Sequence, residues 1–246
     1  MKSLPKPSKL FSATLIIMTS IALSLPFVSC SQSSKEISID GKSFTVLTME
    51  KGKPETATLE TITFNGGMFD NEGCHIYGFG NGKYTATKDG SNYNFEATTT
   101  SSKEGSMMWK GMVMGDILHG EMVWHKEGQA DIVYTFNSDQ IKMASLDGKT
   151  FTTEMKSGDS MVIEEITFKN GMFDSPGCLQ WGFAPAPYQA WEMNGKIMWQ
   201  SLYTSSKEGI MFFTGNVNGN AITVNNLWIK AGQNDSYETS MGTLKQ

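Results

Sequence analysis

The sequence predicts an all-β protein that consists of two small antiparallel β-barrels in tandem, each a meander of about eight strands. Three observations predict this fold class. The chain repeats itself at an offset of 104 residues, apolar and polar residues alternate along short segments, and glycine, asparagine and aspartate separate these segments. Neither copy shows convincing helical periodicity. A repeat of about 100 residues has the length of one small domain, so we expect two domains rather than a solenoid.

The repeat is carried by motifs that return without insertion or deletion. The segment Ile-Thr-Phe at 62–64 returns at 166–168, and Ser-Ser-Lys-Glu-Gly at 101–105 returns at 205–209. Any chemistry that was duplicated with the domain must use residues that both copies contain. The further matching pairs include Asp70/Asp174, Cys74/Cys178, Tyr84/Tyr188, Trp124/Trp228, Lys126/Lys230, Gln129/Gln233 and Asp131/Asp235.

The first thirty residues are typical of a targeting segment. Three lysines precede an apolar stretch at 11–28, and Cys30 follows that stretch after one small residue. This ending resembles the lipobox of bacterial lipoproteins, although Phe27 stands where that motif usually has leucine. An ordinary secretory peptide is one alternative. A transmembrane helix is a weaker one, because serine, threonine and proline interrupt a run that barely reaches the roughly 20 apolar residues a span needs.

The lipobox resemblance implies that Cys30 is acylated, with palmitate as the expected modification. Residues 1–29 are then a signal peptide and residues 30–38 a polar tether. This predicts a lipid-anchored protein of the cell envelope, with the membrane as a partner. Ser31 follows the cysteine in place of the aspartate that resembles an inner-membrane retention signal, which favours the outer membrane of a Gram-negative bacterium.

The two copies define the expected domains. We place the first barrel at 39–139 and the second at 145–246, with the joint near 139–144. Tight turns at Asn65-Gly66-Gly67, Asp89-Gly90 and Gly115-Asp116 separate several strands of the first copy. The expected strands are 43–49, 57–64, 68–71, 83–88, 93–100, 107–114, 117–126 and 132–137.

One hairpin predicts which side chains face the barrel interior. A two-residue turn at Gly115-Asp116 pairs Met114 with Ile117 and Met112 with His119. One face is then apolar throughout, while the other mixes charged residues with methionine, so we take the first as interior. The inner face holds Met107, Trp109, Gly111, Val113, Leu118, Gly120, Met122 and Trp124, and in the second copy Met211, Phe213, Gly215, Val217, Ile222, Val224, Asn226 and Trp228.

These motifs resemble a known family. The Asp-Gly-Lys-x-Phe opening, the Gly-x-Val-x-Gly hairpin and the later Trp-x-Lys occur in both copies and are similar to bacterial lipocalin-like lipoprotein domains. That resemblance implies calycin-type barrels. A narrower likeness is to META-type domains of exported proteins, through the Ile-Thr-Phe strand, Gly73-Cys74-His75 and Tyr84. The asparagine of that family is replaced by His75 here, and its Thr-x-Met-x-Cys motif is missing.

Composition and motifs argue against several functions. The 20 basic residues are all lysine, and loss of the three signal-peptide lysines moves the formal charge from −5 to −8. An acidic chain without arginine is poorly suited to bind nucleic acid. The three histidines all lie in the first copy, and no hydrolase, zinc-protease or phosphate-binding motif occurs. We therefore expect no enzyme activity and no cofactor.

Cys74 and Cys178 occupy matching positions, with one cysteine in each copy. A buried, unreacted thiol is one interpretation, a bridge between the copies is a second, and a redox or metal role is a third. The Ser-Ser-Lys-Glu-Gly segment is either a structural turn or part of a partner surface.

The expected function is binding without catalysis, of a small apolar ligand or of an envelope partner whose identity is unknown. The candidate ligand-binding residues are Met107, Trp109, Met122, Trp124, Met211, Phe213 and Trp228. A structural or interaction module with filled barrels is the alternative. A third hypothesis is Cu(I) or Ag(I) binding in the first copy alone, through Met112, Met114, His119 and His125.

Overall fold

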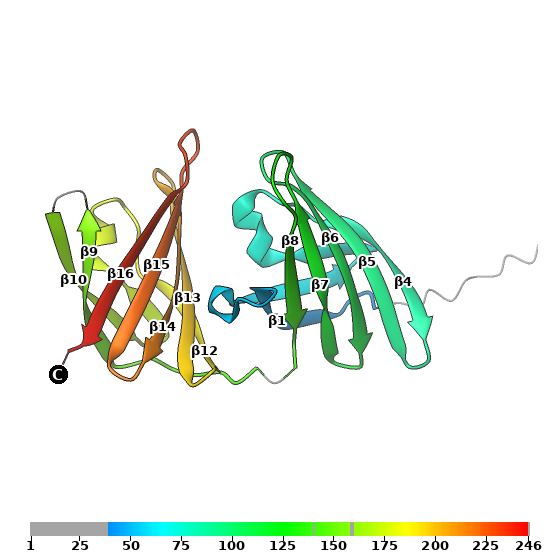
Figure 1. Ribbon diagram of the computed structural model, residues 1–246, viewed down its shortest axis with the longest axis horizontal. Helices are drawn as coiled ribbons and strands as arrows, with labels where there is room; N and C mark the ends of the chain where they lie inside the picture. The colour runs from blue at the N-terminus through cyan, green and yellow to red at the C-terminus, as the bar shows by residue number, and fades with distance from the viewer. Residues whose placement is uncertain (1–38, 140, 158–159, 246) are drawn as a thin grey trace, which may run out of the picture. The chain divides into compact units, whose positions relative to one another are not determined.

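The computed structural model describes residues 39–139, 141–157 and 160–245, and it contains two closed antiparallel β-barrels (Figure 1). Each barrel is an eight-stranded meander whose last strand pairs with its first. The predicted fold class is therefore confirmed. The first barrel contains β1 (Ser43–Glu50), β2 (Thr58–Asn65), β3 (Met68–Asn71), β4 (Gly82–Asp89), β5 (Asn92–Ser101), β6 (Gly105–Met114), β7 (Ile117–His125) and β8 (Ile132–Asn137).

The second barrel repeats this order. It contains β9 (Lys149–Ser157), β10 (Ser160–Lys169), β11 (Met172–Asp174), β12 (Ala186–Met193), β13 (Lys196–Ser205), β14 (Gly209–Asn218), β15 (Ala221–Ile229) and β16 (Ser236–Leu244). The strands from β4 to β7 and from β12 to β15 begin and end at residues related by the same offset of 104. The sequence repeat is thus also a repeat of strand register.

The predicted strands of the first copy all occur, with bounds that agree within two residues. One turn differs in register: Asp89 pairs with Asn92, so the turn is centred on Gly90-Ser91. The structure also contains short helical segments that were not predicted from the sequence, namely η1 (Pro54–Thr56), η2 (Glu72–Tyr77) and α1 (Pro176–Leu179). Such short segments leave no periodic signal, because they contain at most two helical turns.

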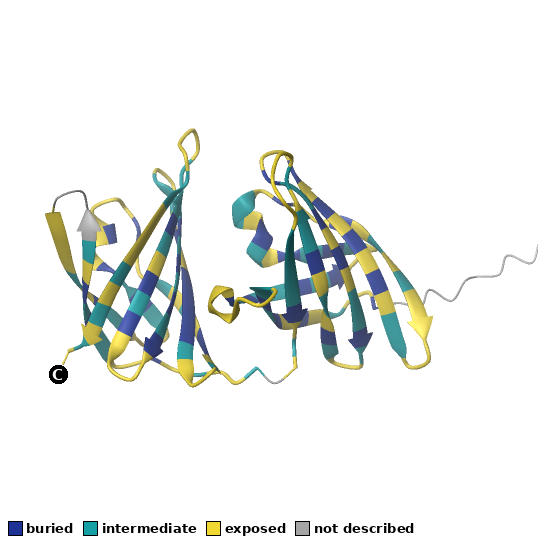
Figure 2. Cartoon of the chain, viewed as in Figure 1, coloured by how far each residue is buried: buried dark blue, intermediate teal, exposed yellow. Residues whose placement is uncertain are grey.

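The predicted hairpin register is confirmed. Met112 pairs with His119 and Met114 with Ile117, as the two-residue turn requires. Buried and exposed residues alternate along β5, β6 and β7 (Figure 2). Met107, Trp109 and Met122 are buried, whereas Met108 between them on the outer face is 44% exposed. The apolar face predicted as interior is therefore the interior.

Aromatic side chains fill the middle of each barrel. In the first barrel the Trp109 ring lies 4.9 Å from Phe69 and 5.7 Å from Phe136, and its indole N–H donates to Thr99 at 3.1 Å. The second barrel is filled by Phe168, Phe173, Trp199, Tyr203 and Phe213. The large residues stand at different positions: the equivalents of Phe95, Thr99 and Trp109 are Trp199, Tyr203 and Phe213.

The Asp-Gly-Lys-x-Phe opening has a structural explanation in both copies. The Asp40 carboxylate accepts hydrogen bonds from the backbone N–H groups of Gly67 and Gly66 and from the Tyr84 hydroxyl. These bonds, led by that from Gly67, hold the pKa of Asp40 below its usual value. Asp147 accepts from Gly171 and Tyr188 in the same way. The motif therefore ties the start of each barrel to its β2–β3 or β10–β11 turn.

The Ser-Ser-Lys-Glu-Gly segment forms the β5–β6 turn. The residues that both copies share in this segment have structural roles. The Ser101 hydroxyl accepts from the backbone N–H groups of Lys103 and Glu104. Glu104 is buried and binds Lys126 at 2.7 Å, while its carbonyl accepts from the Trp124 indole. In the second copy the corresponding Glu208 contacts, to Lys230 and Trp228, are both 2.6 Å. These contacts support the structural-turn interpretation.

Candidate functional site

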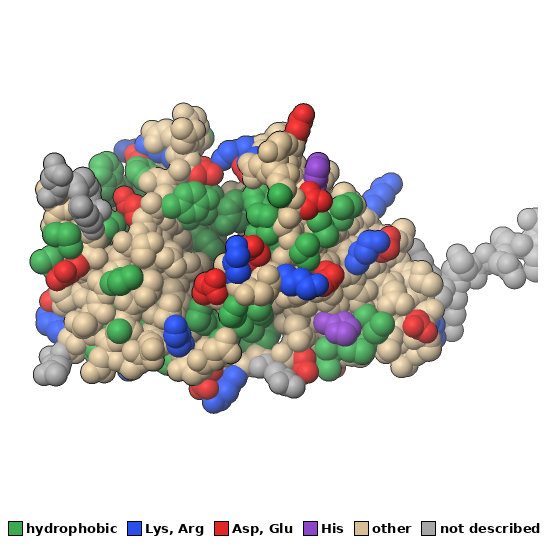
Figure 3. Space-filling model, in the orientation of Figure 1, with side chains coloured by type: hydrophobic (Ala, Val, Ile, Leu, Met, Phe, Trp, Pro, Cys, Tyr) green, Lys and Arg blue, Asp and Glu red, His purple; other side chains and the backbone are tan. Residues whose placement is uncertain are grey.

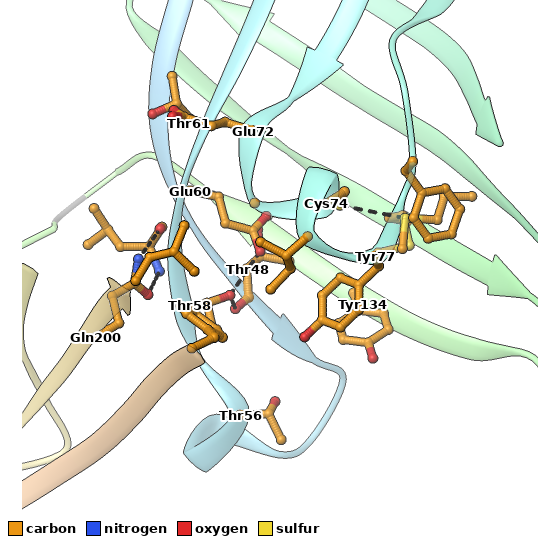
Figure 4. A pocket seen from close by; sticks show the side chains of 18 of the residues that line it. Thr48, Thr56, Thr58, Glu60, Thr61, Glu72, Cys74, Tyr77, Tyr134 and Gln200 are labelled. Atoms are coloured by element: carbon orange, nitrogen blue, oxygen red, sulfur yellow. Dashed lines mark hydrogen bonds between the residues drawn. The ribbon is translucent and has the colours of Figure 1, made fainter. Parts of the chain in front are cut away.

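A pocket of about 500 Å³ opens at the end of the first barrel where η2 lies (Figure 4). Strands β1, β2, β6, β7 and β8 and the helix η2 supply most of its walls, and residues of β12, β13, β14 and β16 complete it. Its lining includes Thr48, Thr58, Glu60, Cys74, Tyr77, Phe79, Met107, Met122, Trp124, Tyr134, Gln200, Leu202, Phe212 and Tyr237. A pocket of this volume is large enough for a small organic molecule.

Glu60 is the central polar group of this pocket. It faces inward from β2, and neutral groups hold its carboxylate. Oε2 accepts from the Thr48 hydroxyl at 2.9 Å and from the Asn71 amide at 2.7 Å. Oε1 accepts from the Thr58 hydroxyl at 2.9 Å. Among the described residues, no lysine or histidine forms an ion pair with Glu60.

Two tyrosines lie beside each other on another wall of the pocket (Figure 4). Tyr77 belongs to η2 and Tyr134 to β8. Burial raises the pKa of both phenols, so they are neutral at physiological pH. Each therefore offers an aromatic surface and an uncharged hydroxyl.

The remaining wall inside the first barrel is apolar. Met107 and Met122 are buried side chains of β6 and β7, and Trp124 is partly buried with its indole N–H bonded to the Glu104 carbonyl. Cys74 packs beneath them, with its sulfur 3.6 Å from the Met107 sulfur. The pocket thus combines one carboxylate with aromatic and thioether surfaces.

Gln200 of β13 contacts the outer side of β2 next to the pocket. Its amide donates to the Leu59 carbonyl at 2.6 Å, and its side-chain oxygen accepts from the Leu59 N–H at 2.9 Å. The β2–β3 pairing begins only at Ile62, so these backbone groups of Leu59 have no β3 partner. Gln200 therefore satisfies backbone groups that would otherwise lack a hydrogen bond.

The equivalent end of the second barrel is occupied by Tyr203. Its hydroxyl donates to the Phe173 carbonyl at 2.7 Å and accepts from the Ser175 N–H at 3.1 Å. Its ring lies 6.4 Å from Phe183, the equivalent of the pocket residue Phe79. The equivalent residue of the first copy, Thr99, is also buried; it accepts the Trp109 indole N–H and does not line the pocket.

Both internal cysteines are buried free thiols. Burial raises the pKa of Cys74, and burial raises that of Cys178 to about 11. Cys178 repeats the methionine contact of Cys74, with its sulfur 3.6 Å from that of Met211. The structure therefore supports the interpretation of buried, unreacted thiols, and no bridge joins the copies.

The structure divides the predicted ligand-binding residues into two groups. Met107, Met122 and Trp124 line the pocket together. Trp109 lies deeper, within the aromatic core, and does not line it. Met211, Phe213 and Trp228 belong to the second barrel's core and its edge, and they do not line this pocket either.

The predicted metal residues lie on the outer side of the β6–β7 hairpin. Met112 faces His119 across the strands, as expected, and Met114 lies beside it at the turn. His125 lies at the far end of β7 and hydrogen-bonds Asp131 at 2.7 Å. Across the described ranges no group of three or more histidine, cysteine, aspartate or glutamate side chains could hold a metal ion. Binding of a soft metal ion through methionine stays a prediction.

Three pocket residues were not predicted from the sequence: Glu60, Tyr77 and Tyr134. A usable signal existed for the first: Glu60 lies on the same inward face of its strand as Ile62 and Phe64, and the second copy repeats it as Glu164. A charged residue at an interior position in both copies indicates a specific role. Cys30, the predicted lipidation site, lies outside the described residues.

Comparison of the chain with protein-family models gives no match, and comparison with curated proteins gives none either. The tandem eight-stranded barrels fit a duplicated lipocalin-like fold. On the face shown in Figure 3, lysines lie next to acidic residues. Exposed ion pairs of this kind include Lys51–Glu121. Within the described part of the chain, no helix has both the length and the apolar character needed to cross a membrane.

Proposed function

We propose that this protein is a non-catalytic envelope lipoprotein that binds one small ligand with an apolar body at the open end of its first barrel. The observation that carries the proposal is the pocket of about 500 Å³ beside an otherwise filled aromatic core. Its walls are mainly apolar and aromatic, with a few polar groups that can orient a ligand, as is typical of small-molecule sites. In this proposal the second barrel has a structural role, since aromatic side chains fill its interior and several of its residues complete the pocket wall.

The lipid anchor is the second part of the proposal, and Cys30→Ser tests it. Without a thiol to acylate, the protein is expected to leave the membrane fraction and to lose labelling by a fatty-acid analogue. Fractionation and labelling of cells that express each form provide the measurement. Unchanged membrane association of the variant would contradict acylation at this residue.

Ligand binding is tested by a matched pair of variants, Trp124→Ala and Trp228→Ala. The two indoles make the same contact, to the carbonyl of Glu104 or Glu208, but only Trp124 lines the pocket. Titration with the neutral apolar probe N-phenyl-1-naphthylamine is expected to show one site per chain and a change in tryptophan fluorescence. Trp124→Ala should weaken this binding about tenfold or more, since a large aromatic contact is lost.

Trp228→Ala is the control for stability. Both variants lose an equivalent hydrogen bond and ring, so their midpoints of denaturation should fall by similar amounts, whereas Trp228→Ala should keep the wild-type affinity for the probe. If the wild-type protein binds no apolar probe, the pocket proposal fails. The alternative function, a structural or interaction module without ligand, is favoured by the filled aromatic cores and would then stand.

A further inference from the structure

We infer that the ligand of the first barrel is a monovalent organic cation, an amine whose charged nitrogen binds Glu60 and whose apolar body lies against the aromatic and methionine walls. This inference rests on the proposed binding function and specifies its ligand class. The charges, the hydrogen-bonding capacity of Glu60 and the character of the walls support it independently.

The charge of the pocket is negative and has no balancing cation. The charged residues among its lining are Glu60 inside the barrel and Glu72 at the exposed rim; lysine and histidine are absent from that lining. Glu60 is partly buried, where water screens its charge less than at the surface. An anionic ligand would be repelled here, and a neutral one would leave the charge uncompensated.

The Glu60 carboxylate has capacity for another donor. Oε2 accepts two hydrogen bonds, from Thr48 and Asn71, while Oε1 accepts one, from Thr58. A carboxylate offers about four acceptor positions, so Oε1 can accept an ammonium N–H. The three neutral donors hold the carboxylate in place without neutralising it. The site is therefore preorganised for a cation rather than already paired with one.

The neighbouring walls suit an organic cation more than a metal ion. Tyr77, Tyr134 and Trp124 present aromatic rings, which attract cations through their faces and also bury apolar groups. Calcium takes six to eight oxygen ligands and magnesium an octahedral set, which one carboxylate beside methionines does not provide. The volume of about 500 Å³ also exceeds what a bare ion needs.

The second copy offers a matched control. Glu164 is the equivalent of Glu60, but its Oε1 accepts from the Gly177 N–H at 2.6 Å and from the Ser175 hydroxyl at 2.9 Å. This carboxylate stabilises the start of α1. Substitution of Glu164 should therefore affect the second barrel without affecting amine binding.

Three ligands with one apolar body and different charges test the inference: 1-adamantanamine, 1-adamantanol and 1-adamantanecarboxylate. Calorimetric titration of the full-length mature protein is expected to show the amine binding about ten- to a hundredfold more tightly than the alcohol, and the carboxylate most weakly. Glu60→Gln, which keeps the size of the side chain, should reduce amine affinity to that of the alcohol. Glu164→Gln should leave the three affinities unchanged.

The outcomes separate this inference from the function on which it rests. Equal binding of amine and alcohol, or tighter binding of the carboxylate, would overturn the cation inference and leave an apolar-ligand protein. Failure of all three ligands together with N-phenyl-1-naphthylamine would overturn both. If Glu60→Gln does not fold, the comparison of the three ligands with the wild-type protein still decides the question.

Discussion

Replacement of Trp109 by alanine is expected to lower the free energy of unfolding of the first barrel by about 3–5 kcal/mol. Trp109 is completely buried and lies between Phe69 and Phe136 in the aromatic core. Its removal leaves a cavity that rigid β-strands cannot close, and it deprives the buried Thr99 hydroxyl of its indole donor. Denaturant unfolding monitored by circular dichroism measures the loss.

Met108→Ala is the matched control, because Met108 directly precedes Trp109 on the same strand but points outward and is 44% exposed. That change should cost within about 0.5 kcal/mol, as surface substitutions usually do. A loss below about 1 kcal/mol for Trp109→Ala would show that the barrel interior is not a packed core. Trp109 would then become available again as a ligand-binding residue.

The fold was predictable because the repeat and the hairpin constrain it. A side-chain period of two means that one correct turn fixes the face of every residue in both strands. The Gly115-Asp116 turn fixed the inward and outward faces of β6 and β7 in this way. The equivalent hairpin of the second copy predicted the same inner face. The duplicated motif then carried the prediction to both barrels.

The pocket was less predictable, because its lining combines residues of a short helical segment with residues that are far apart in the sequence. Thr99 and its equivalent Tyr203 are both buried, but the large side chains beside them differ, so only the packing shows how each interior is filled. Tyr77 was equally hidden, because the short helix that carries it has no periodic pattern.

The two copies also differ in which of two paired core residues is large and which is small. Gly120 pairs with Phe136 in the first barrel, and the equivalent pair in the second is Val224 with Ser240. A Cβ atom on Gly120 would lie 2.4 Å from the Phe136 ring and 2.2 Å from the Lys110 carbonyl oxygen. The Phe136 ring and the β6 backbone therefore both occupy the space that a side chain at position 120 would need.

This difference predicts strong coupling between the two positions. Gly120→Val alone should lower the free energy of unfolding by about 3 kcal/mol, at the upper end of overpacking effects, and Phe136→Ser alone by about 3–5 kcal/mol through the cavity it creates. The double variant should cost at least about 1 kcal/mol less than the sum, because loss of the ring removes its share of the overpacking, while the contact with the β6 backbone stays. Denaturant unfolding of the four forms completes the cycle.

Gly120→Val combined with Val224→Gly is the control, since these residues lie in the cores of separate barrels and their effects should add within about 0.5 kcal/mol. If the free-energy changes of Gly120→Val and Phe136→Ser also add, the two positions are not coupled, and the ring moves aside freely. Coupling in that cycle alone would show that each copy reaches a filled core with its own set of large and small residues.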